Sequence, residues 1–252
     1  MYIWIDEVGY GSIAGPVLTC AVAADPNHPP IKGVKDSKQL SKHKREDLYV
    51  KIIEEVDYEF GAASPKRIEK MNIHYARYYA MKLAIEKLVK RGIQPEKVIV
   101  DGKFPIPDLS LLQEPVIKAD EKYWQCGAAS ILAKVKRDSI MANLATIDKY
   151  SHYDWQNNAG YFVEQTHKWG VVEFGGTILH RNNFGYYQYC LFCRKKYEEF
   201  LEQGKTLKDY KQFEIDETKK YGKSFYSIWK SGEYDCWKII KQGEKTTNNF
   251  VL

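Results

Sequence analysis

Acidic residues follow short apolar runs at three places in this 252-residue chain. The acids are Asp6, Glu7, Asp101 and Asp120. In α/β sheets, the groups that bind and react collect beyond the ends of strands, so these acids could meet at one edge of a sheet. Each acid taken singly could equally be solvated or cap a helix, so the positions alone leave both interpretations open.

Carboxylates brought together repel each other unless a cation neutralises them. Oxygen ligands with no His or Cys nearby in the sequence favour Mg²⁺ or Mn²⁺ over Zn²⁺. Two such ions, roughly 3.5–4 Å apart, can activate a water and stabilise the leaving oxygen of a phosphodiester. Because neighbouring strand residues point to opposite faces, Asp6 and Glu7 can share this site only if the chain bends there, and Gly9 and Gly11 allow a bend.

Strands and long helices mix along the chain, which predicts an α/β fold. The expected strands are Tyr2–Asp6, Val17–Ala24, Tyr58–Ser64, Val98–Val100 and Pro115–Ala119. The expected helices are one capped by Ser41 that runs to about Val56, then Asn72–Arg91 and Gly127–Leu144. These elements would carry the four acids at or just after strand ends.

Composition indicates a soluble globular protein, with 44% hydrophobic and 28% charged residues. The net charge of +5 permits a polyanionic partner without requiring one. Five scattered cysteines do not predict a disulfide scaffold, and the acidic first residues do not resemble a signal peptide. The longest apolar run, residues 13–24, is too short to span a bilayer, so we expect a cytoplasmic protein with no membrane association.

The last part of the chain differs from the rest in character. Residues 197–252 hold ten Lys against ten Asp and Glu, so the whole positive excess lies in residues 1–196. The same stretch is dense in aromatic residues. We therefore expect a catalytic domain at residues 1–196 and a C-terminal helical, aromatic-rich extension or small subdomain at 197–252. Its aromatic side chains could form a local core or stack on bases.

Several segments resemble the motifs of the ribonuclease HII family and occur in that family's order. They are residues 5–17 (IDEVGYGSIAGPV), 35–41 (KDSKQLS), 63–73, 98–102 (VIVDG), 118–138, Gly160-Tyr161, His167 and residues 180–184 (HRNNF). The match covers about residues 1–190. The resemblance implies a ribonuclease H-like mixed β-sheet flanked by helices, acting as a monomer.

The resemblance also implies an activity and roles for single residues. The activity is hydrolysis of the RNA strand of RNA/DNA hybrids and cleavage 5′ to ribonucleotides embedded in duplex DNA, which leaves 3′-hydroxyl and 5′-phosphate ends. The metal-binding and catalytic residues would be Asp6, Glu7, Asp101 and Asp120, holding two Mg²⁺ or Mn²⁺ ions. The substrate-binding residues would be Gly9, Tyr10, Gly11, Ser37, Lys38 and Tyr161.

The implied substrate contacts differ in kind. The backbone of Gly9–Gly11 would approach the ribose 2′-hydroxyl, the group that distinguishes RNA from DNA. Ser37 and Lys38 would hold phosphates of the duplex. Tyr161 would stack on the sugar of the deoxynucleotide that follows the ribonucleotide.

Two departures from the family's pattern bear on the substrate. The family usually has Arg between the two turn glycines, where this chain has Tyr10, so a phosphate contact can be lost. The segment from Tyr161 to His167 is one residue longer than usual and lacks the second glycine. These departures put in question the preference for the RNA-to-DNA junction and activity on a single embedded ribonucleotide.

Other interpretations stay open. Clustered carboxylates also suit a resolvase-like or transposase-like DNA nuclease, and Tyr10 suits a duplex-binding protein that has lost catalysis. Cys190 and Cys193 have the spacing of half a zinc site, but the same spacing suits an ordinary helix. Asp138 fits a supporting or surface role, with direct catalysis as the alternative. His180 and Arg181 fit positioning of the C-terminal segment, with acid–base chemistry as the alternative.

Overall fold

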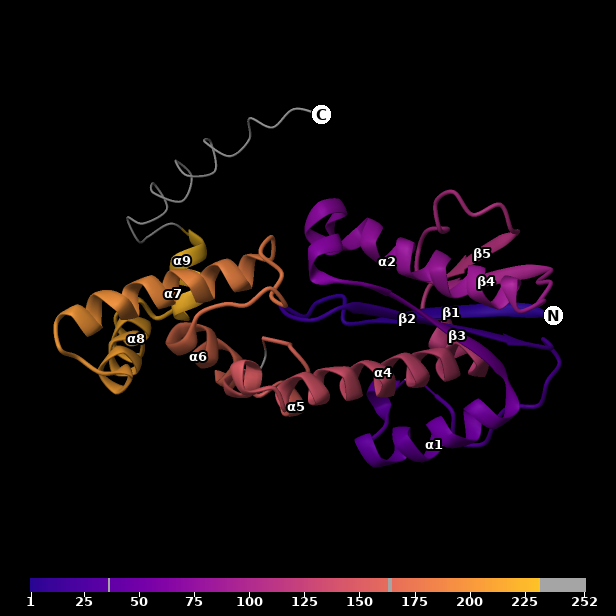
Figure 1. Cartoon of the computed structure of the whole chain (residues 1–252), viewed down its shortest axis with the longest axis horizontal. Helices are drawn as coiled ribbons and strands as arrows, with labels where there is room; N and C mark the ends of the chain where they lie inside the picture. Colours follow the sequence, from indigo (N-terminus) through magenta and orange to yellow (C-terminus); the bar gives the residue numbers. More distant parts are fainter. Residues whose placement is uncertain (36, 163–164, 232–252) are drawn as a thin grey trace. The chain divides into compact units, whose positions relative to one another are not determined.

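The computed structural model describes residues 1–35, 37–162 and 165–231, which form two compact units (Figure 1). The first unit comprises residues 1–170 and 176–187, and the second comprises residues 171–175 and the chain from 188 onward. This division falls earlier in the chain than the boundary at residue 196 that composition predicts. The assignment of catalysis to residues 1–196 stays a prediction.

A mixed five-stranded sheet lies at the centre of the first unit, in the order β3-β2-β1-β4-β5. The strands are β1 (Tyr2–Val8), β2 (Val17–Ala24), β3 (Asp57–Ala63), β4 (Lys97–Asp101) and β5 (Gln113–Val116). β1 pairs antiparallel with β2, which pairs antiparallel with β3, whereas β1, β4 and β5 run parallel. The carboxyl ends of β1 and β4 therefore lie at the same edge of the sheet.

Helices cover both faces of this sheet, as Figure 1 shows. The long helices are α1 (Lys42–Glu55), α2 (Pro65–Lys90) and α4 (Trp124–Ala145). Short helices of the same unit are α3 (Ala119–Lys122), α5 (Trp155–Asn158) and the 3-10 turns Ser37–Gln39 and Asp148–Tyr153. Helices α6 (Gln165–Phe174) and α7 (Gly185–Glu202) carry the chain from one unit to the other.

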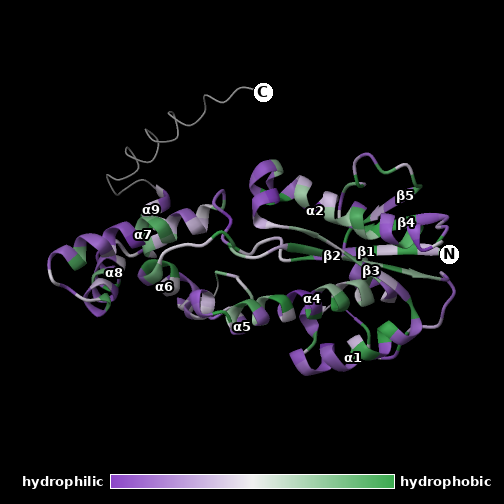
Figure 2. Ribbon diagram, in the orientation of Figure 1, coloured by the Kyte–Doolittle hydropathy of each residue, from purple (hydrophilic) through white to green (hydrophobic). Residues whose placement is uncertain are grey.

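The alternation of side chains along β1 separates two hydrophobic cores. Ile3 and Ile5 pack with Met81 and Ile85 of α2. Trp4 belongs to a different cluster, on the face that α4 covers, together with Cys126. Figure 2 shows the hydrophobic residues concentrated in the central strands, as expected for a sheet buried on both faces. The predicted α/β architecture of a ribonuclease H-like sheet flanked by helices is confirmed.

The structure changes two of the predicted elements. The strand expected at Pro115–Ala119 lies earlier, because Ala119 begins helix α3. β5 is an edge strand, where the missing N–H of proline is tolerated. The helix expected from Asn72 begins at Pro65 and breaks at Asn72, whose φ is 60°. The Asn72 side chain accepts the backbone N–H of His74 at 2.8 Å, so it caps the second segment, from which Arg77 projects.

The second unit is helical, with α8 (Leu207–Tyr221) and α9 (Phe225–Ser231) following α7. Tyr189, Tyr226 and Trp229 pack ring against ring, with centroids 5.1–5.8 Å apart. The aromatic residues of the described part of the extension thus contact one another, as a local core would require. Along the described residues, no helix has both the length and the apolar character needed to cross a membrane.

Candidate active site

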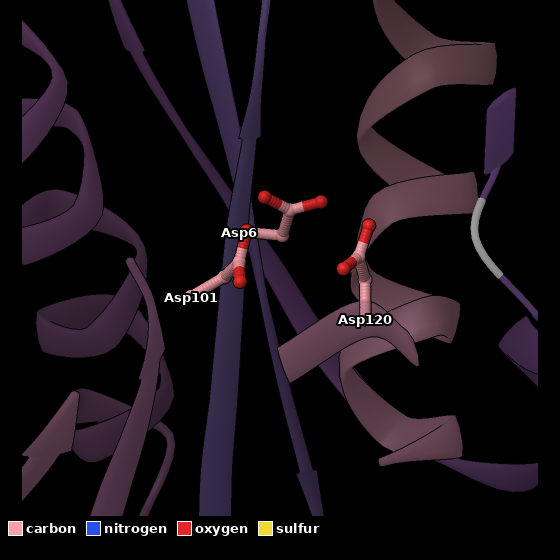
Figure 3. Close-up of side chains that lie close together, drawn as sticks. All are labelled: Asp6, Asp101 and Asp120. Atoms are coloured by element: carbon pink, nitrogen blue, oxygen red, sulfur yellow. The ribbon is translucent and has the colours of Figure 1, made fainter. Parts of the chain in front are cut away.

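Three of the four predicted acids come together at the edge of the sheet. Asp6 lies on β1, Asp101 ends β4, and Asp120 lies on α3. One carboxylate oxygen from each lies within 4.8 Å of those of the other two. Asp6 and Asp120 are buried, and the three side chains converge in Figure 3. The structure therefore makes a compact carboxylate cluster from residues far apart in the sequence.

Backbone hydrogen bonds hold this cluster in place. The amide of Ala119 donates to Oδ1 of Asp101 at 2.7 Å, which joins the end of β4 to the start of α3. The amide of Glu7 donates to Oδ1 of Asp6 at 2.7 Å. Lys118, just before α3, takes a left-handed conformation with φ 56°. This turn brings Asp120 back toward the sheet.

The electrostatics of the cluster favour a bound cation. Burial, followed by the charges of Glu7 and Asp101, raises the pKa of Asp6 well above its usual value. Hydrogen bonds from Ser130 and from the Glu7 amide act in the opposite direction. Such mutual repulsion is relieved by a cation between the carboxylates.

The ligand atoms of the cluster are carboxylate oxygens, which suit Mg²⁺ or Mn²⁺. Cys126 lies close by, but burial and then the charges of the acids, Asp6 first, raise the pKa of its thiol well above its usual value. The thiol donates to the carbonyl of Ile5 at 3.8 Å and is not among the converging ligand groups. The donor set fits a hard divalent ion.

Glu7 occupies a different position from the three aspartates. β1 continues through Val8 with regular pairing, Asp6 opposite Cys20 and Glu7 opposite Thr19, so the chain does not bend between the two acids. Glu7 therefore projects from the face that α2 covers, and its Oε1 lies 3.4 Å from Nη1 of Arg77. Burial is the main cause of its raised pKa, which Arg77 lowers and Asp101 raises.

The glycine turn follows β1 directly. Gly9 has φ +84°, and a Cβ there would lie 2.2 Å from Nε of Arg137, so only glycine fits. Gly11 has no neighbour within 4 Å of an added Cβ. Tyr10, between them, is 37% exposed, and its hydroxyl forms a hydrogen bond with Nδ1 of His74 at 3.1 Å. The turn thus presents one face to solvent and rests on Arg137 with the other.

Two fully buried arginines support this turn. Arg137 donates to the carbonyls of Pro16, Ala14 and Ala159 and to the Ser12 hydroxyl, at 2.6–3.1 Å. Arg181 donates to the carbonyls of Tyr10 and Gly15 at 3.0 Å. Neither guanidinium has an ion-pair partner within residues 1–35, 37–162 and 165–231. The expected positioning role of Arg181 is consistent with these contacts, although they hold the N-terminal turn.

Ser37 and Lys38 border the acid cluster from the other side. A cavity of about 290 Å³ is lined by Asp6, Glu7, Val8, Ser37, Lys38, Arg45, Ser130, Lys134 and Tyr161. Ser37 is buried, and its hydroxyl bonds to that of Ser130 at 2.9 Å. Arg45 donates to the carbonyl of Ser37 at 3.1 Å and fixes the loop. Residue 36 of the predicted loop lies outside the described residues.

Tyr161 lines the same cavity and is held at both backbone groups. Its amide donates to the carbonyl of Asn158 at 2.9 Å, and its carbonyl accepts from Nδ1 of His167 at 3.0 Å. The guanidinium carbon of Arg137 and the ammonium of Lys134 lie 5.3 and 5.5 Å from the centre of its ring. Residues 163 and 164, within the lengthened segment, lie outside the described residues.

Two buried histidines stand behind Tyr161. His180 accepts the amide of Thr177 at Nδ1, so its Nε2–H donates to Nε2 of His167 at 3.1 Å. His167 in turn donates from Nδ1 to the Tyr161 carbonyl. Burial lowers the pKa of His167 to about 4 and that of His180 to about 3. Both rings are neutral near pH 7 and are committed to structure.

The remaining candidates lie away from the cluster. Asp138 pairs with Lys134 at 2.9 Å, which fits the supporting role. Cys190 and Cys193 are buried and form no disulfide bond within the described residues, which place neither in a group of metal-binding geometry. The sequence does not single out Ser130, Arg77 or Arg137, although the structure places all three beside the acids or the turn. Ser130 and Arg137 lie two turns apart on α4 within its apolar face, a signal that polar side chains are buried there.

The chain is similar to known proteins over most of its length. The family model of ribonuclease HII matches residues 3–185. The chain belongs to the ribonuclease HII family. It is 42% identical over 180 residues to ribonuclease HII of Macrococcus caseolyticus, covering 71% of this chain and 65% of that protein. It is also 42% identical to ribonuclease HII of Pelagibacter ubique, covering 71% and 93% of the two chains.

Solved structures agree with the family assignment. Ribonuclease H2 of Pyrococcus horikoshii superimposes with a TM-score of 0.59 at 25% identity, covering 78% of this chain and 98% of that one. The ribonuclease HII of Archaeoglobus fulgidus, solved in a complex with PCNA, has a TM-score of 0.59 at 27% identity, with coverage of 72% and 92%. The recognition from sequence motifs is confirmed, and the family is one of endoribonucleases.

Proposed function

We propose that this ribonuclease HII family member hydrolyses the RNA strand of RNA/DNA hybrids and cuts 5′ to ribonucleotides embedded in duplex DNA. The products are a 3′-hydroxyl and a 5′-phosphate. The observation that carries the proposal is the group of Asp6, Asp101 and Asp120, whose carboxylate oxygens lie within 4.8 Å of one another. Asp6 of this group also lines a cavity bordered by cationic side chains.

The three aspartates would hold divalent metal, with Glu7 contributing from the neighbouring face of β1. Two Mg²⁺ or Mn²⁺ ions bound here would activate a water and stabilise the leaving oxygen of the phosphodiester. Asp6, the central acid of the cluster, is the residue best placed to bridge them. The raised pKa of Asp6 supports this assignment, because divalent metal would favour its ionised form.

The remaining contacts serve the substrate. Lys38, at the rim of the cavity, would bind a phosphate, and the buried Ser37 would hold the loop that carries it. The exposed backbone at Gly11 leaves room for close approach of a ribose 2′-hydroxyl. Tyr161 would stack on the sugar of the next deoxynucleotide. Its two backbone hydrogen bonds limit the positions that its ring can take.

The experiment compares duplexes that differ in a single hydroxyl. Purified protein with Mg²⁺ or Mn²⁺ should nick a DNA duplex that carries one ribonucleotide, and should cut a long RNA/DNA hybrid. A matched all-DNA duplex should stay intact, and chelation with EDTA should stop the reaction. Equal cutting of the all-DNA duplex would point to a resolvase-like nuclease, and tight binding without turnover would point to a duplex-binding protein.

Nucleic acid is the partner that the cavity suits, since Lys38, Arg45 and Lys134 line it beside the acids. We further propose that the protein acts as a monomer in the cytoplasm. The cluster is complete within one chain, so catalysis does not require a second copy. Size-exclusion chromatography with light scattering would test the monomer, and the monomer fraction should carry the activity.

A further inference from the structure

Arg77 is a cationic residue beside the active site. It is not among the residues that line the cavity. It projects from the second segment of α2 and contacts Glu7, which itself lines the cavity together with Lys38. Its Nη1 lies 3.4 Å from Oε1 of Glu7, and its Nη2 donates to the Tyr78 hydroxyl at 2.9 Å. The side chain is 13% exposed, so part of it remains open to solvent.

The hydrogen-bonding capacity of Arg77 is largely unused. A guanidinium carries five N–H donors, and the described residues account for two contacts. The contact with Glu7 is longer than the roughly 2.7–2.9 Å of a good charge-assisted hydrogen bond. Nε is buried and has no hydrogen-bond partner among the described residues. Unmade donors on a mostly buried charge cost free energy, so this arrangement suits an acceptor that arrives with a ligand.

Two aromatic rings hold the guanidinium next to the glycine turn. Its central carbon lies 4.6 Å from the ring centre of Tyr78 and 5.6 Å from that of Tyr10. Tyr10 is itself tied to α2 through the hydrogen bond of its hydroxyl with His74. Tyr10 brings no charge to the turn, so Arg77 supplies the cation on this side.

We propose that Arg77 is a phosphate-binding residue that holds a backbone phosphate of the nucleic acid beside the Gly9–Gly11 turn. The proposal rests on the proposed function and adds a contact to it. The planar fork of a guanidinium matches two phosphate oxygens, and the weak contact with Glu7 leaves donors available for them. Lys38, which lines the cavity with Glu7, and Arg77, which contacts Glu7, would then both bind phosphates of the substrate.

The test measures binding without turnover. Affinity for a fluorescein-labelled RNA/DNA hybrid is determined by anisotropy in EDTA over a series of KCl concentrations, for the wild type and Arg77→Met. Loss of one phosphate contact should lower the slope of log K against log salt by about 0.9 and weaken binding roughly tenfold at low salt. Arg77→Lys should keep most of the slope, because it keeps the charge.

Arg91→Met is the matched control. Arg91 caps the same helix, but its guanidinium pairs with Asp57 and Glu59 at 2.7 and 3.3 Å, so its charge is already engaged. Its loss should leave the slope unchanged. Circular dichroism of each variant shows that the fold is retained. An Arg77→Met protein that is folded and keeps the wild-type slope would overturn the proposal.

A second variant tests the location of the contact. Because Tyr10 lies next to Arg77, an arginine at position 10 can reach the same space, so Tyr10→Arg should restore the slope that Arg77→Met loses. A loss that Tyr10→Arg does not reverse would contradict a phosphate beside the turn.

A third measurement separates the phosphate contact from support of the metal site. Calorimetric titration with Mn²⁺ should give the same affinity for Arg77→Met and wild type, within about twofold, if the main role of Arg77 is toward the phosphate. Weakened Mn²⁺ binding with an unchanged salt slope would assign Arg77 to Glu7 and overturn the proposal. Failure of the proposed function is distinct, since it would appear as absent cleavage by the wild type.

Discussion

Two groups of like charge in the first unit have different surroundings. Asp6, Asp101 and Asp120 face one another at the edge of the sheet and repel. Arg137 and Arg181 are also buried without ion-pair partners in the described part of the chain, but backbone carbonyls accept their hydrogen bonds. The acids repel one another and suit an external cation, whereas the arginines donate to the turn, although Nη2 of Arg181 is buried without a hydrogen-bond partner among the described residues. The mutually repelling acids are the candidates for chemistry, and the two arginines determine the shape of the turn.

The largest effect is expected from a substitution in the group of aspartates. Asp6→Asn should reduce cleavage of a ribonucleotide-containing duplex by about three orders of magnitude or more, because the metal loses its central ligand. The same change removes repulsion, so the metal-free variant should melt at or above the wild-type temperature. Single-turnover cleavage and calorimetric melting in EDTA check both parts. Cleavage by Asp6→Asn at the wild-type rate would contradict the assignment of Asp6 to the active site.

The next largest effect is expected from the loss of a buried arginine. Arg137→Met should lower the free energy of unfolding by about 3–5 kcal/mol, because four acceptors, three of them buried, lose a charged donor. Urea denaturation measures the change. Arg194→Met is the control, since Arg194 also donates to carbonyls but lies in the second unit at a partly exposed position. An equal loss of unfolding free energy in the two variants would show that the buried hydrogen bonds of Arg137 contribute no more than those of Arg194.

Metal should affect only the group of aspartates. Mn²⁺ at a hundred times its dissociation constant should raise the free energy of unfolding of the wild type by about 2.7 kcal/mol. Asp101→Asn should show little of this gain, whereas Lys134→Met should show most of it. Urea titrations with and without Mn²⁺ supply the comparison. An equal gain in Asp101→Asn would place the ion elsewhere.

The smallest effect concerns the histidines behind Tyr161. Both have a folded-state pKa below the usual 6.5, about 4 for His167 and about 3 for His180. Between those values and 6.5 the unfolded chain binds more protons than the folded chain, so stability falls as the pH falls through 6.5. The loss by pH 5 is on the order of 2 kcal/mol for each histidine.

Replacement of one histidine tests this origin. His180→Gln should remove on the order of 2 kcal/mol of the pH-dependent loss between pH 6.5 and 5, whatever its effect on stability at pH 7. Urea titrations at several pH values give the slopes. A variant whose stability has the same pH dependence as the wild type would show that His180 does not stay neutral in the fold.

The sequence predicts the sheet and the acids because each strand and the acid after it are indicated by neighbouring residues in the chain. β2 was predicted with its observed bounds, and Asp101 ends an apolar strand in both the prediction and the structure. The neighbouring residues do not indicate whether the side chains of Asp6 and Glu7 lie on the same face of the sheet. The arrangement depends on whether β1 continues past Asp6, and its pairing with β2 through Val8 decides that.

The cationic residues were harder to predict for a different reason. The importance of Arg137 and Arg77 comes from contacts with residues more than sixty positions away. Nothing in the residues beside them indicates those partners. The family resemblance predicts substrate-binding residues in the turn and in the loop at Ser37, but it does not indicate the side chains that hold these segments.

The most direct test of the account is the position of the metal. Crystals soaked in Mn²⁺ and measured at the manganese absorption edge should show anomalous density between the carboxylates of Asp6, Asp101 and Asp120. Asp101→Asn crystals treated identically should show little of it. Manganese bound only at other acidic groups of the wild type, with none at these three aspartates, would contradict the account.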